Sequence, residues 1–296
     1  MVADVSVVSA ALAVLGCSSP HRVLQVLTAG GSGAQVFLLE LPTGRAVLKV
    51  TGDLGWRDRA RRELGVYLDL AGRLGVGVPA VIAAGDDHGV IRVLLAAHPP
   101  YPPAPAVTDG EWTSLAGQLG RLHRPPNPTP PWLGHRRWPG SEQLERAVDW
   151  WTARGFAAAA SRAAALIAAG RERDENVPRV LTHGDCHVGN LLHSPTGQTL
   201  WVDWQEVCLS SGLVDLVFLW QRAEFAGATP PRETMWDAYL AARGFGADLD
   251  LRAALAVAEL GLLLVDWPPF LPYGPQHQQD LMADRLGQLV DELTGR

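Results

Sequence analysis

A short polar segment between two apolar, β-type segments constrains this chain more than any other feature. The segment contains His183-Gly184-Asp185, and Asn190 follows five positions after the aspartate. A second apolar stretch ends at Asp203, thirteen positions after Asn190. Phosphoryl transfer needs one carboxylate to accept the proton of the attacking hydroxyl. It also needs oxygen ligands that hold Mg²⁺ against the phosphates. Asp185, Asn190 and Asp203 offer side chains of the kinds that these three roles require.

The lysine content singles out a second residue. Of the 25 basic residues only Lys49 is a lysine, and it lies in the apolar, β-type stretch 45–51. Arginine replaces lysine readily on a solvated surface but not where a compact ammonium group is required. Glu63 follows fourteen positions later, in a stretch predicted as a helix over 57–74, and an ion pair with this carboxylate could orient Lys49.

A glycine-rich segment precedes this lysine. Gly30-Gly31-Ser32-Gly33 connects two β-type stretches, sixteen positions before Lys49. Glycine allows a close approach of the backbone, whose N–H groups can then surround a phosphate. We therefore predict that these four residues contact a nucleotide.

The first hundred residues read as a small antiparallel sheet with an inserted helix. The predicted strands are 21–27, 34–41, 45–51, 78–84 and 90–97, and an opening helix covers 5–15. Prolines cluster over 99–105, which cannot continue a strand or a helix and indicates a hinge. The remainder is mostly helical, with helices predicted at 112–123, 143–153, 157–169, 233–242, 251–265 and 278–293.

The sequence His-Gly-Asp, then Asn five positions after the Asp, then an apolar strand ending in Asp resembles the aminoglycoside phosphotransferase family. That family is a branch of the protein-kinase-like fold. By this resemblance Asp185 is the catalytic base, and Asn190 and Asp203 are ligands of Mg²⁺. Asp215 matches a family aspartate that braces the catalytic loop.

The resemblance also implies a two-lobed α+β fold. Its N-terminal nucleotide-binding lobe covers 1–97 as a small antiparallel sheet. Its mostly helical C-terminal lobe covers 98–296 and carries the catalytic loop and the substrate site. Lys49 then contacts the phosphates of ATP or GTP, the co-substrate. Ala96 and His98 lie where the lobes join, and their backbone is expected to bind the nucleotide base.

The family holds its acceptor with carboxylates, and aromatic faces can bind a cation. The candidate acceptor-binding residues are Asp149, Trp151, Trp204, Glu206, Glu224, Asp266 and Trp267. Residues 101–296 contain 16 basic and 23 acidic groups, and this acidic excess favours a cationic acceptor.

The implied function is antibiotic inactivation, acting on an aminoglycoside or on a basic cyclic peptide such as viomycin or capreomycin. A choline, homoserine or sugar kinase of the same family is the alternative, since it would use the same catalytic residues.

Two other classes explain fewer residues. A metal hydrolase built on His183, Asp185 and His187, with His193 nearby, leaves Asn190, Asp203 and Lys49 without roles. A non-catalytic protein with a kinase fold is disfavoured because the whole catalytic set is present.

Charge and cysteine content complete the expectations. The net charge of −6 disfavours nucleic acid and anionic membranes as partners. Three cysteines without paired spacing favour the reducing cytoplasm. We expect a monomer or a weak dimer that binds a small molecule.

Overall fold

The computed structural model describes residues 2–27, 33–244, 249–273 and 276–295. The chain forms two compact units. The first comprises Met1–Pro103, Pro128–Leu133 and His183–Val207. The second comprises Ala104–Asn127, Gly134–Thr182 and Cys208–Arg296.

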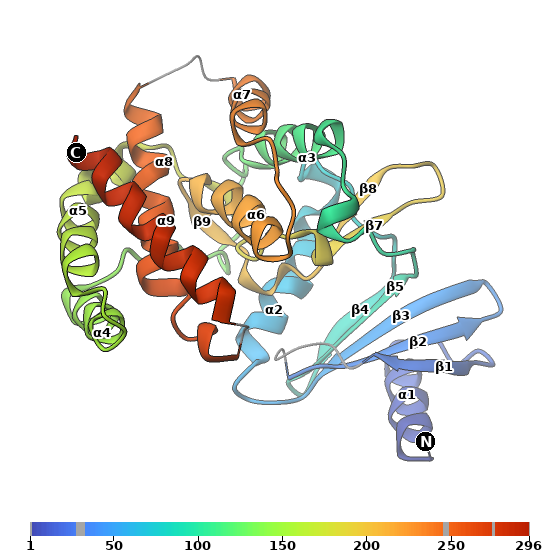
Figure 1. The fold of residues 1–296 in the computed structure, drawn as a ribbon. Coiled ribbons are helices and arrows are strands. Elements are labelled where there is room, and N and C mark those ends of the chain that lie inside the picture. The colour runs from blue at the N-terminus through green and yellow to red at the C-terminus, as the bar shows by residue number, and fades with distance from the viewer. Residues whose placement is uncertain (1, 28–32, 245–248, 274–275, 296) are drawn as a thin grey trace. The chain divides into compact units, whose positions relative to one another are not determined.

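An antiparallel sheet of five strands, in the order β1-β2-β3-β5-β4, forms the first unit's frame (Figure 1). The strands are β1 Arg22–Leu27, β2 Gln35–Leu41, β3 Gly44–Thr51, β4 Val81–Asp87 and β5 Val90–Ala96. All five predicted strands are confirmed, with β4 displaced three residues toward the C-terminus. Along β3 the side chains alternate, so that Ala46 and Leu48 are buried on one face while Lys49 points to the other.

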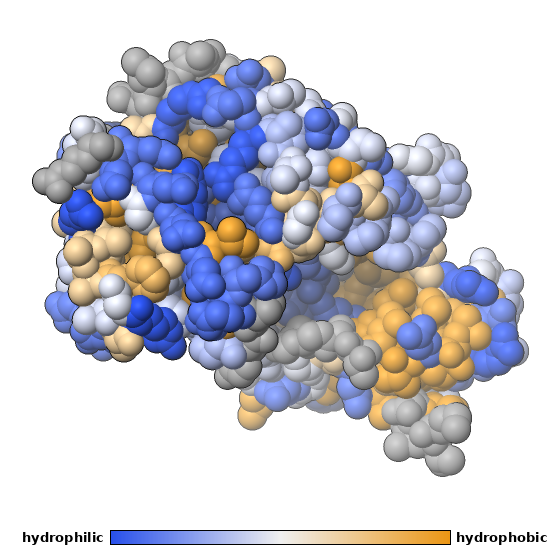
Figure 2. All heavy atoms as spheres, in the orientation of Figure 1, coloured by the Kyte–Doolittle hydropathy of each residue, from blue (hydrophilic) through white to orange (hydrophobic). Residues whose placement is uncertain are grey.

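The predicted opening helix is confirmed as α1, Val2–Val14, and it covers one face of this sheet. Its buried side chains, Val8 and Leu12 among them, pack against Phe37 of β2 and Leu48 of β3. Figure 2 shows apolar side chains gathered over the part of the molecule formed by the sheet.

Helix α2, Arg57–Gly65, carries Glu63 and is shorter than the predicted 57–74. The backbone widens into a π-helical turn over Val66–Leu70 and then tightens into a 3₁₀ turn over Ala71–Arg73. At the junction, Gly65 packs so closely on Trp132 that an added Cβ would lie 2.5 Å from its ring. Only a residue without a side chain fits there.

The segment 183–207 belongs to the first unit, although the predicted boundary placed everything after residue 97 in the second. It contains the hairpin of β7, Leu191–His193, and β8, Thr199–Trp201. Backbone hydrogen bonds attach this hairpin to the earlier chain, from the His193 N–H to the Pro99 carbonyl (2.9 Å) and from the Trp201 N–H to the Gly77 carbonyl (2.8 Å). Short 3₁₀ turns cover Val188–Asn190 and Trp204–Glu206.

The second unit is mainly helical, as predicted. Its helices are α3 Asp109–Leu122, α4 Ser141–Thr152, α5 Ala157–Asn176, α6 Leu213–Phe225, α7 Arg232–Arg243, α8 Leu249–Gly261 and α9 Gln276–Thr294. Its short strands β6, Val180–Thr182, and β9, Cys208–Ser210, pair antiparallel. Further short turns are 3₁₀ at Ala104–Ala106 and Leu271–Tyr273 and π-helical at Leu262–Asp266.

Local chemistry explains two of these helices. Thr108 and Glu111 form the capping box that their spacing predicts, since the Glu111 N–H donates to the Thr108 hydroxyl and the Glu111 carboxylate accepts from the Thr108 N–H. Helix α6 was not predicted, although Leu213, Leu216 and Trp220 are buried at helical spacing along it. In the part of the chain that the structure describes, no helix combines the length and the hydropathy needed to cross a membrane.

The packing of α1 predicts the effect of truncating its buried side chain. Leu12 is 1% exposed, and Leu12→Ala should lower the free energy of unfolding by about 2–5 kcal/mol because it leaves a cavity against the sheet. Val14→Ala, on the same helix at a side chain that is 50% exposed, should change it by less than about 0.5 kcal/mol. Urea unfolding followed by circular dichroism measures both variants. Equal losses would contradict the packing described for α1.

Candidate active site

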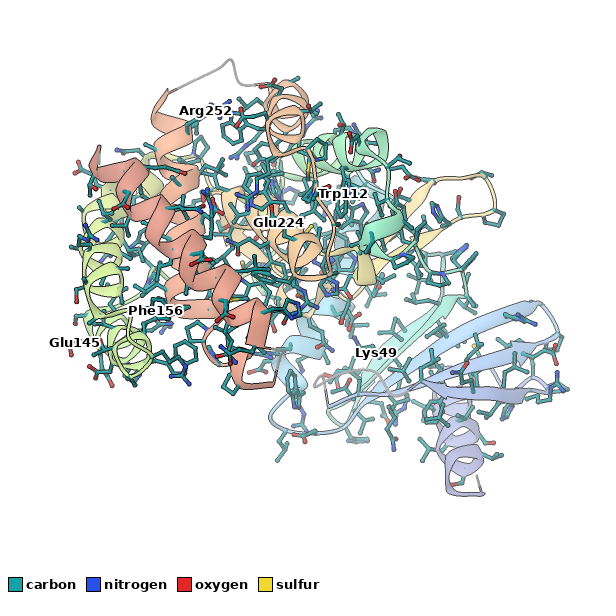
Figure 3. The ribbon with its side chains drawn as sticks, in the orientation of Figure 1. Lys49, Trp112, Glu145, Phe156, Glu224 and Arg252 are labelled. Carbon is teal, nitrogen blue, oxygen red and sulfur yellow. The ribbon has the colours of Figure 1, made fainter. Side chains whose placement is uncertain are left out.

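Lys49, labelled in Figure 3, contacts two carboxylates in the first unit. Its ammonium nitrogen is 2.7 Å from a carboxylate oxygen of Glu63 and 2.7 Å from Oδ1 of Asp203. The predicted pair of Lys49 with Glu63 is therefore present, and the structure adds Asp203 to it. Strand β3, helix α2 and the segment after β8 each contribute one of the three side chains.

Burial and charge oppose each other in this cluster. Burial by itself lowers the pKa of Lys49, but the carboxylates of Glu63 and Asp203 outweigh it and hold that pKa above its usual value. Burial also raises the pKa of Glu63, and the nearby ammonium counteracts this rise. The ammonium group therefore keeps two carboxylates together that would otherwise repel each other.

Asp203 adopts a left-handed backbone conformation, with φ 65° and ψ 59°. This conformation is uncommon outside glycine, although aspartate tolerates it better than most residues. It ends the extended chain after β8 and starts the turn Trp204–Glu206. Local strain of this kind is typical of functional sites.

Side chains of residues 183–190, the predicted catalytic segment, hold this segment in place. The amide nitrogen of Asn190 donates to the Asp185 carbonyl (2.9 Å) and to Oδ2 of its carboxylate (3.0 Å). His183 donates from Nε2 to the Val202 carbonyl (3.0 Å) and accepts the Asp185 N–H at Nδ1 (3.3 Å). Both ring nitrogens of His183 are thus engaged with the backbone, which argues against a metal-ligand role for this residue.

Gly184 has a positive φ of 83°, and an added Cβ would lie 2.1 Å from the carbonyl oxygen of Glu206. Both facts require glycine at this position. The turn before Asp185 is therefore pressed directly against the backbone that follows Asp203.

His187 faces the carboxylate of Asp185, with Nε2 3.7 Å from Oδ2. Because its Nδ1 accepts the Gly189 N–H at 3.1 Å, the neutral ring carries its proton on Nε2, toward Asp185. Burial raises the pKa of Asp185, but His187, His183 and Asn190 together lower it to about 2. Asp185 is consequently ionised at neutral pH. No sequence motif singled out His187 for this role.

The residues predicted to bind Mg²⁺ fit that ion. The two hydrogen bonds donated by the Asn190 amide nitrogen fix which way the amide faces and leave its oxygen on the other side. The Val202 N–H donates to the Asn190 carbonyl (3.0 Å), which brings Asn190 beside the residue before Asp203. An amide oxygen and a carboxylate are the hard oxygen ligands that Mg²⁺ prefers. Among the residues that the structure describes, no group of three or more His, Cys, Asp and Glu side chains is arranged to hold a metal ion.

The structure describes only some of the residues that were predicted to contact a nucleotide. Gly30, Gly31 and Ser32 lie outside the described residues. Gly33 has φ 60° and packs under the ring of Trp56, where an added Cβ would meet the ring at 2.2 Å.

Ala96 ends β5 opposite Ala46 of β3, and its N–H donates to the Ala80 carbonyl (2.9 Å). His98 follows after two positions, and its buried Nδ1 has no hydrogen-bond partner among the described residues.

Three of the predicted acceptor-binding residues are corrected, because Trp151, Trp204 and Trp267 are at most 5% exposed. Their rings pack inside the protein and present no face to a ligand. Their indole N–H groups donate to protein oxygens. Trp204 packs against the ring of His183, with the ring centres 4.5 Å apart.

The acidic candidates have different environments. Glu224, at the end of α6 (Figure 3), accepts two hydrogen bonds from Arg232, at 2.6 and 2.7 Å. Arg232 and Arg285 also hold the buried Glu259, so Glu224 belongs to a network that joins α6, α7, α8 and α9. Asp149 is exposed on α4.

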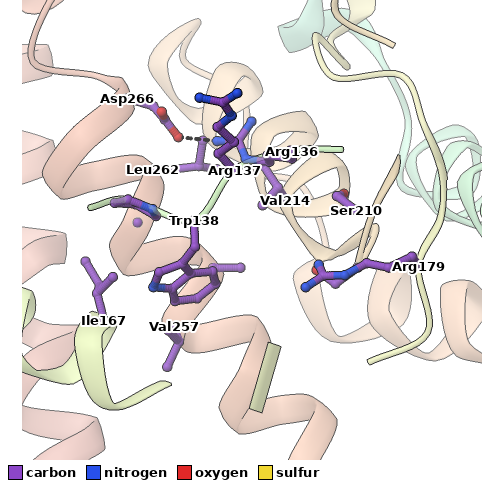
Figure 4. A pocket seen from close by; sticks show the side chains of 14 residues that line it. Arg136, Arg137, Trp138, Ile167, Arg179, Ser210, Val214, Val257, Leu262 and Asp266 are labelled. Carbon is purple, nitrogen blue, oxygen red and sulfur yellow. Dashed lines mark hydrogen bonds and ion pairs between the residues drawn. The ribbon is translucent and has the colours of Figure 1, made fainter. Parts of the chain in front are cut away.

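Asp266 lines a small hollow of about 40 Å³ within the second unit (Figure 4). Its carboxylate pairs with Arg136 at 2.5 Å. Helices α5, α6 and α8 and the segments 136–139, 179 and 210–211 form the walls. The remaining acidic candidate, Glu206, lies in the first unit and pairs with Arg59 at 3.1 Å.

Comparison with known proteins identifies the family and the fold. A family model described as "Phosphotransferase enzyme family" matches residues 24–255. None of the curated proteins compared with the chain matches it.

Three solved structures share the fold. A choline/ethanolamine kinase family protein from Mesorhizobium loti is 18% identical with a TM-score of 0.66, over 99% of this chain and 97% of that chain. The macrolide 2'-phosphotransferase MphH from Brachybacterium faecium is 18% identical with a TM-score of 0.63, over 96% and 97%. Spectinomycin phosphotransferase APH(9)-Ia, in complex with ADP and spectinomycin, is 14% identical with a TM-score of 0.62, over 98% and 97%. These likenesses confirm the predicted two-lobed, protein-kinase-like α+β fold.

Removing the central ammonium group should destabilise the chain in a pH-dependent way. Lys49→Ala leaves Glu63 buried without its partner, which costs about 3–5 kcal/mol in such pairs. Because burial raises the pKa of Glu63, its protonated form supports folding at low pH, and this support is lost as the pH rises through that raised pKa. The loss of unfolding free energy should therefore be larger at pH 8 than at pH 5.

Urea unfolding at the two pH values measures this difference. The double variant Lys49→Met/Glu63→Gln is the control, because it removes both charges and should reduce the pH dependence. A loss that is equal at pH 5 and pH 8 would show that Glu63 does not depend on the ammonium group.

Proposed function

Because the chain belongs to the phosphotransferase enzyme family, we propose that it transfers the γ-phosphoryl group of ATP or GTP to a hydroxyl of a small molecule. The observation that carries this proposal is the bridge from Lys49 to Glu63 and Asp203. It lies in the same unit as Asp185, whose carboxylate is oriented by Asn190.

Asp185 receives the proton of the attacking hydroxyl. With a pKa of about 2, its carboxylate is a weak base, so it orients the hydroxyl and accepts the proton late, as the bond to phosphorus forms. The hydrogen bond from Asn190 and the facing Nε2 of His187 restrict the carboxylate to one orientation. Orientation of this kind contributes to rate by placing the reacting atoms in line.

Lys49 binds the phosphates. An ammonium group has three donors, and the contacts with Glu63 and Asp203 account for two of them. The third can donate to a phosphate oxygen. Asn190 and Asp203 would hold Mg²⁺, which supplies positive charge against the transferring phosphoryl group. Asp203 would then hold the metal ion and the lysine together.

We propose a cationic antibiotic as the acceptor. The acidic excess of residues 101–296 supports this class, and Asp149 and Asp266 are the carboxylates proposed to bind it. The solved structures that share the fold include a macrolide 2'-phosphotransferase and a spectinomycin phosphotransferase. We further propose that the enzyme acts in the cytoplasm and needs neither nucleic acid nor a membrane.

A metabolite kinase is the second candidate. The choline/ethanolamine kinase family protein has a TM-score of 0.66 with this chain, and choline is also a cation with a hydroxyl. The catalytic residues are expected to be the same for either acceptor.

A panel of acceptors separates the two candidates. The protein is incubated with Mg²⁺, with ATP or GTP, and with aminoglycosides, viomycin, capreomycin, macrolides, spectinomycin, choline, homoserine or sugars. Mass spectrometry then detects the gain of one phosphoryl group. We expect a gain on a cationic antibiotic. A gain on choline, homoserine or a sugar alone would favour the metabolite kinase, and no gain on any compound would contradict the antibiotic proposal.

Asp185→Asn tests the catalytic assignment. The variant should lower kcat by about 10²–10⁴-fold, because the amide cannot accept the hydroxyl's proton. MgATP affinity should change little, because the side-chain oxygen of an asparagine at this position can still accept the hydrogen bond from the Asn190 amide. Steady-state kinetics on the accepted compound and calorimetric titration with MgATP measure the two effects. Activity that survives the substitution would remove Asp185 from the mechanism.

A further inference from the structure

Glu206 stands three positions after Asp203, at the end of the turn Trp204–Glu206. Its carboxylate contacts two arginines of helix α2, with Oε1 3.1 Å from Nε of Arg59 and Oε2 3.9 Å from Nη2 of Arg62. Arg62 also donates from Nε to the Gln205 carbonyl at 3.0 Å. Side chain and backbone of this turn are therefore both attached to α2.

The two arginines stand on the helix that presents Glu63 to Lys49. Arg62 directly precedes Glu63, and Arg59 lies one helical turn earlier. Any displacement of α2 relative to the turn would move Glu63 away from Asp203, and Lys49 cannot then remain 2.7 Å from both carboxylates.

Glu206 also contacts the catalytic segment through its backbone. Its carbonyl oxygen occupies the space where a side chain at position 184 would lie, directly before Asp185. One residue thus touches the helix of Glu63 with its side chain and the turn before Asp185 with its backbone.

The contact extends to the end of the glycine-rich segment. The guanidinium of Arg59 stacks on the ring of Trp56, 4.6 Å from the ring centre. The same ring covers Gly33. The stacking holds the Arg59 side chain in place. It also connects the ion pair of Arg59 and Glu206 to Gly33, the last residue of the predicted phosphate-binding segment.

These contacts contribute little to stability. Glu206 is 38% exposed and Arg59 is 43% exposed, and ion pairs at such positions contribute about 0–1 kcal/mol. Their arrangement instead bears on the geometry of the nucleotide and metal site.

We propose that Glu206, held by Arg59 and Arg62, is a positioning residue that sets helix α2 against Asp203 and thereby determines the affinity for MgATP. It is then not an acceptor-binding carboxylate. This inference rests on the proposed function, since it assigns a role within the same site.

The variants follow from the contacts. Glu206→Gln removes the negative charge that pairs with the two arginines. Arg59→Glu reverses the charge of one arginine, and Arg59→Glu/Glu206→Arg restores an ion pair between positions 59 and 206 with the charges exchanged. Arg61→Gln is the matched control, because Arg61 lies on the same helix but pairs with Asp86 at 2.8 Å instead.

Calorimetric titration of each full-length variant with MgATP and steady-state kinetics on an accepted compound give the readouts. Glu206→Gln and Arg59→Glu should weaken MgATP binding by about 3–30-fold, the range seen when residues that couple two sites are changed. The charge-swapped pair should recover only part of the loss, because the arginine introduced at position 206 repels Arg62, and Arg61→Gln should match the wild type. The acceptor KM and the thermal unfolding midpoint should stay near their wild-type values in all four.

Each other outcome overturns the inference in a recognisable way. If Glu206→Gln binds MgATP as the wild type does, and the wild type transfers phosphate normally, the positioning role of Glu206 is contradicted and the proposed function stands. A raised acceptor KM with unchanged MgATP binding makes Glu206 an acceptor contact. A wild type that binds no MgATP overturns the proposed function and this inference with it.

Discussion

The ammonium group of Lys49 brings together two carboxylates, one close to it in the sequence and one far from it. Glu63 stands fourteen positions away and Asp203 stands 154 positions away, yet each lies 2.7 Å from the same nitrogen. Two carboxylates this close repel each other unless a cation lies between them. The sheet, helix α2 and the segment after β8 must therefore pack in one arrangement. Residues 183–207 belong to the first unit for the same reason, since Asp203 must lie close to Lys49 of β3.

The backbone of this unit adapts to the charged cluster at several points. Asp203 takes a left-handed conformation, Gly184 leaves room for a neighbouring carbonyl, and the helix after Glu63 widens into a π-helical turn. Departures of this kind cost free energy and persist where surrounding contacts impose them. Here they fall within the segments that carry Glu63, Asp185 and Asp203, and they hold these side chains in fixed positions relative to one another. Rigidity of the site thus arises from close backbone packing as much as from hydrogen bonds.

Much of this arrangement could be predicted from the sequence. The five strands, the opening helix, the capping box and the pair of Lys49 with Glu63 follow from apolar alternation, turn residues and spacing. Helix α6 was not predicted, because most of residues 213–220 are apolar and such a run fits a buried strand as well as a helix. Spacing could not reveal that Trp151, Trp204 and Trp267 are buried or that Glu224 is bound by Arg232, since both depend on tertiary packing. The contacts of Glu206 with α2 and of His187 with Asp185 likewise join segments whose approach no local pattern encodes.

Lys49, Asn190 and Asp203 are proposed to form one site for a nucleotide and a divalent metal ion. Mn²⁺ can replace Mg²⁺ and reports its own ligands through its electron paramagnetic resonance spectrum. Titration of the protein with Mn²⁺ and ADP should show one bound ion per chain that requires the nucleotide and is lost in Asp203→Asn. A nucleotide that binds equally well without metal, or an Mn²⁺ signal that Asp203→Asn leaves unchanged, would contradict the claim.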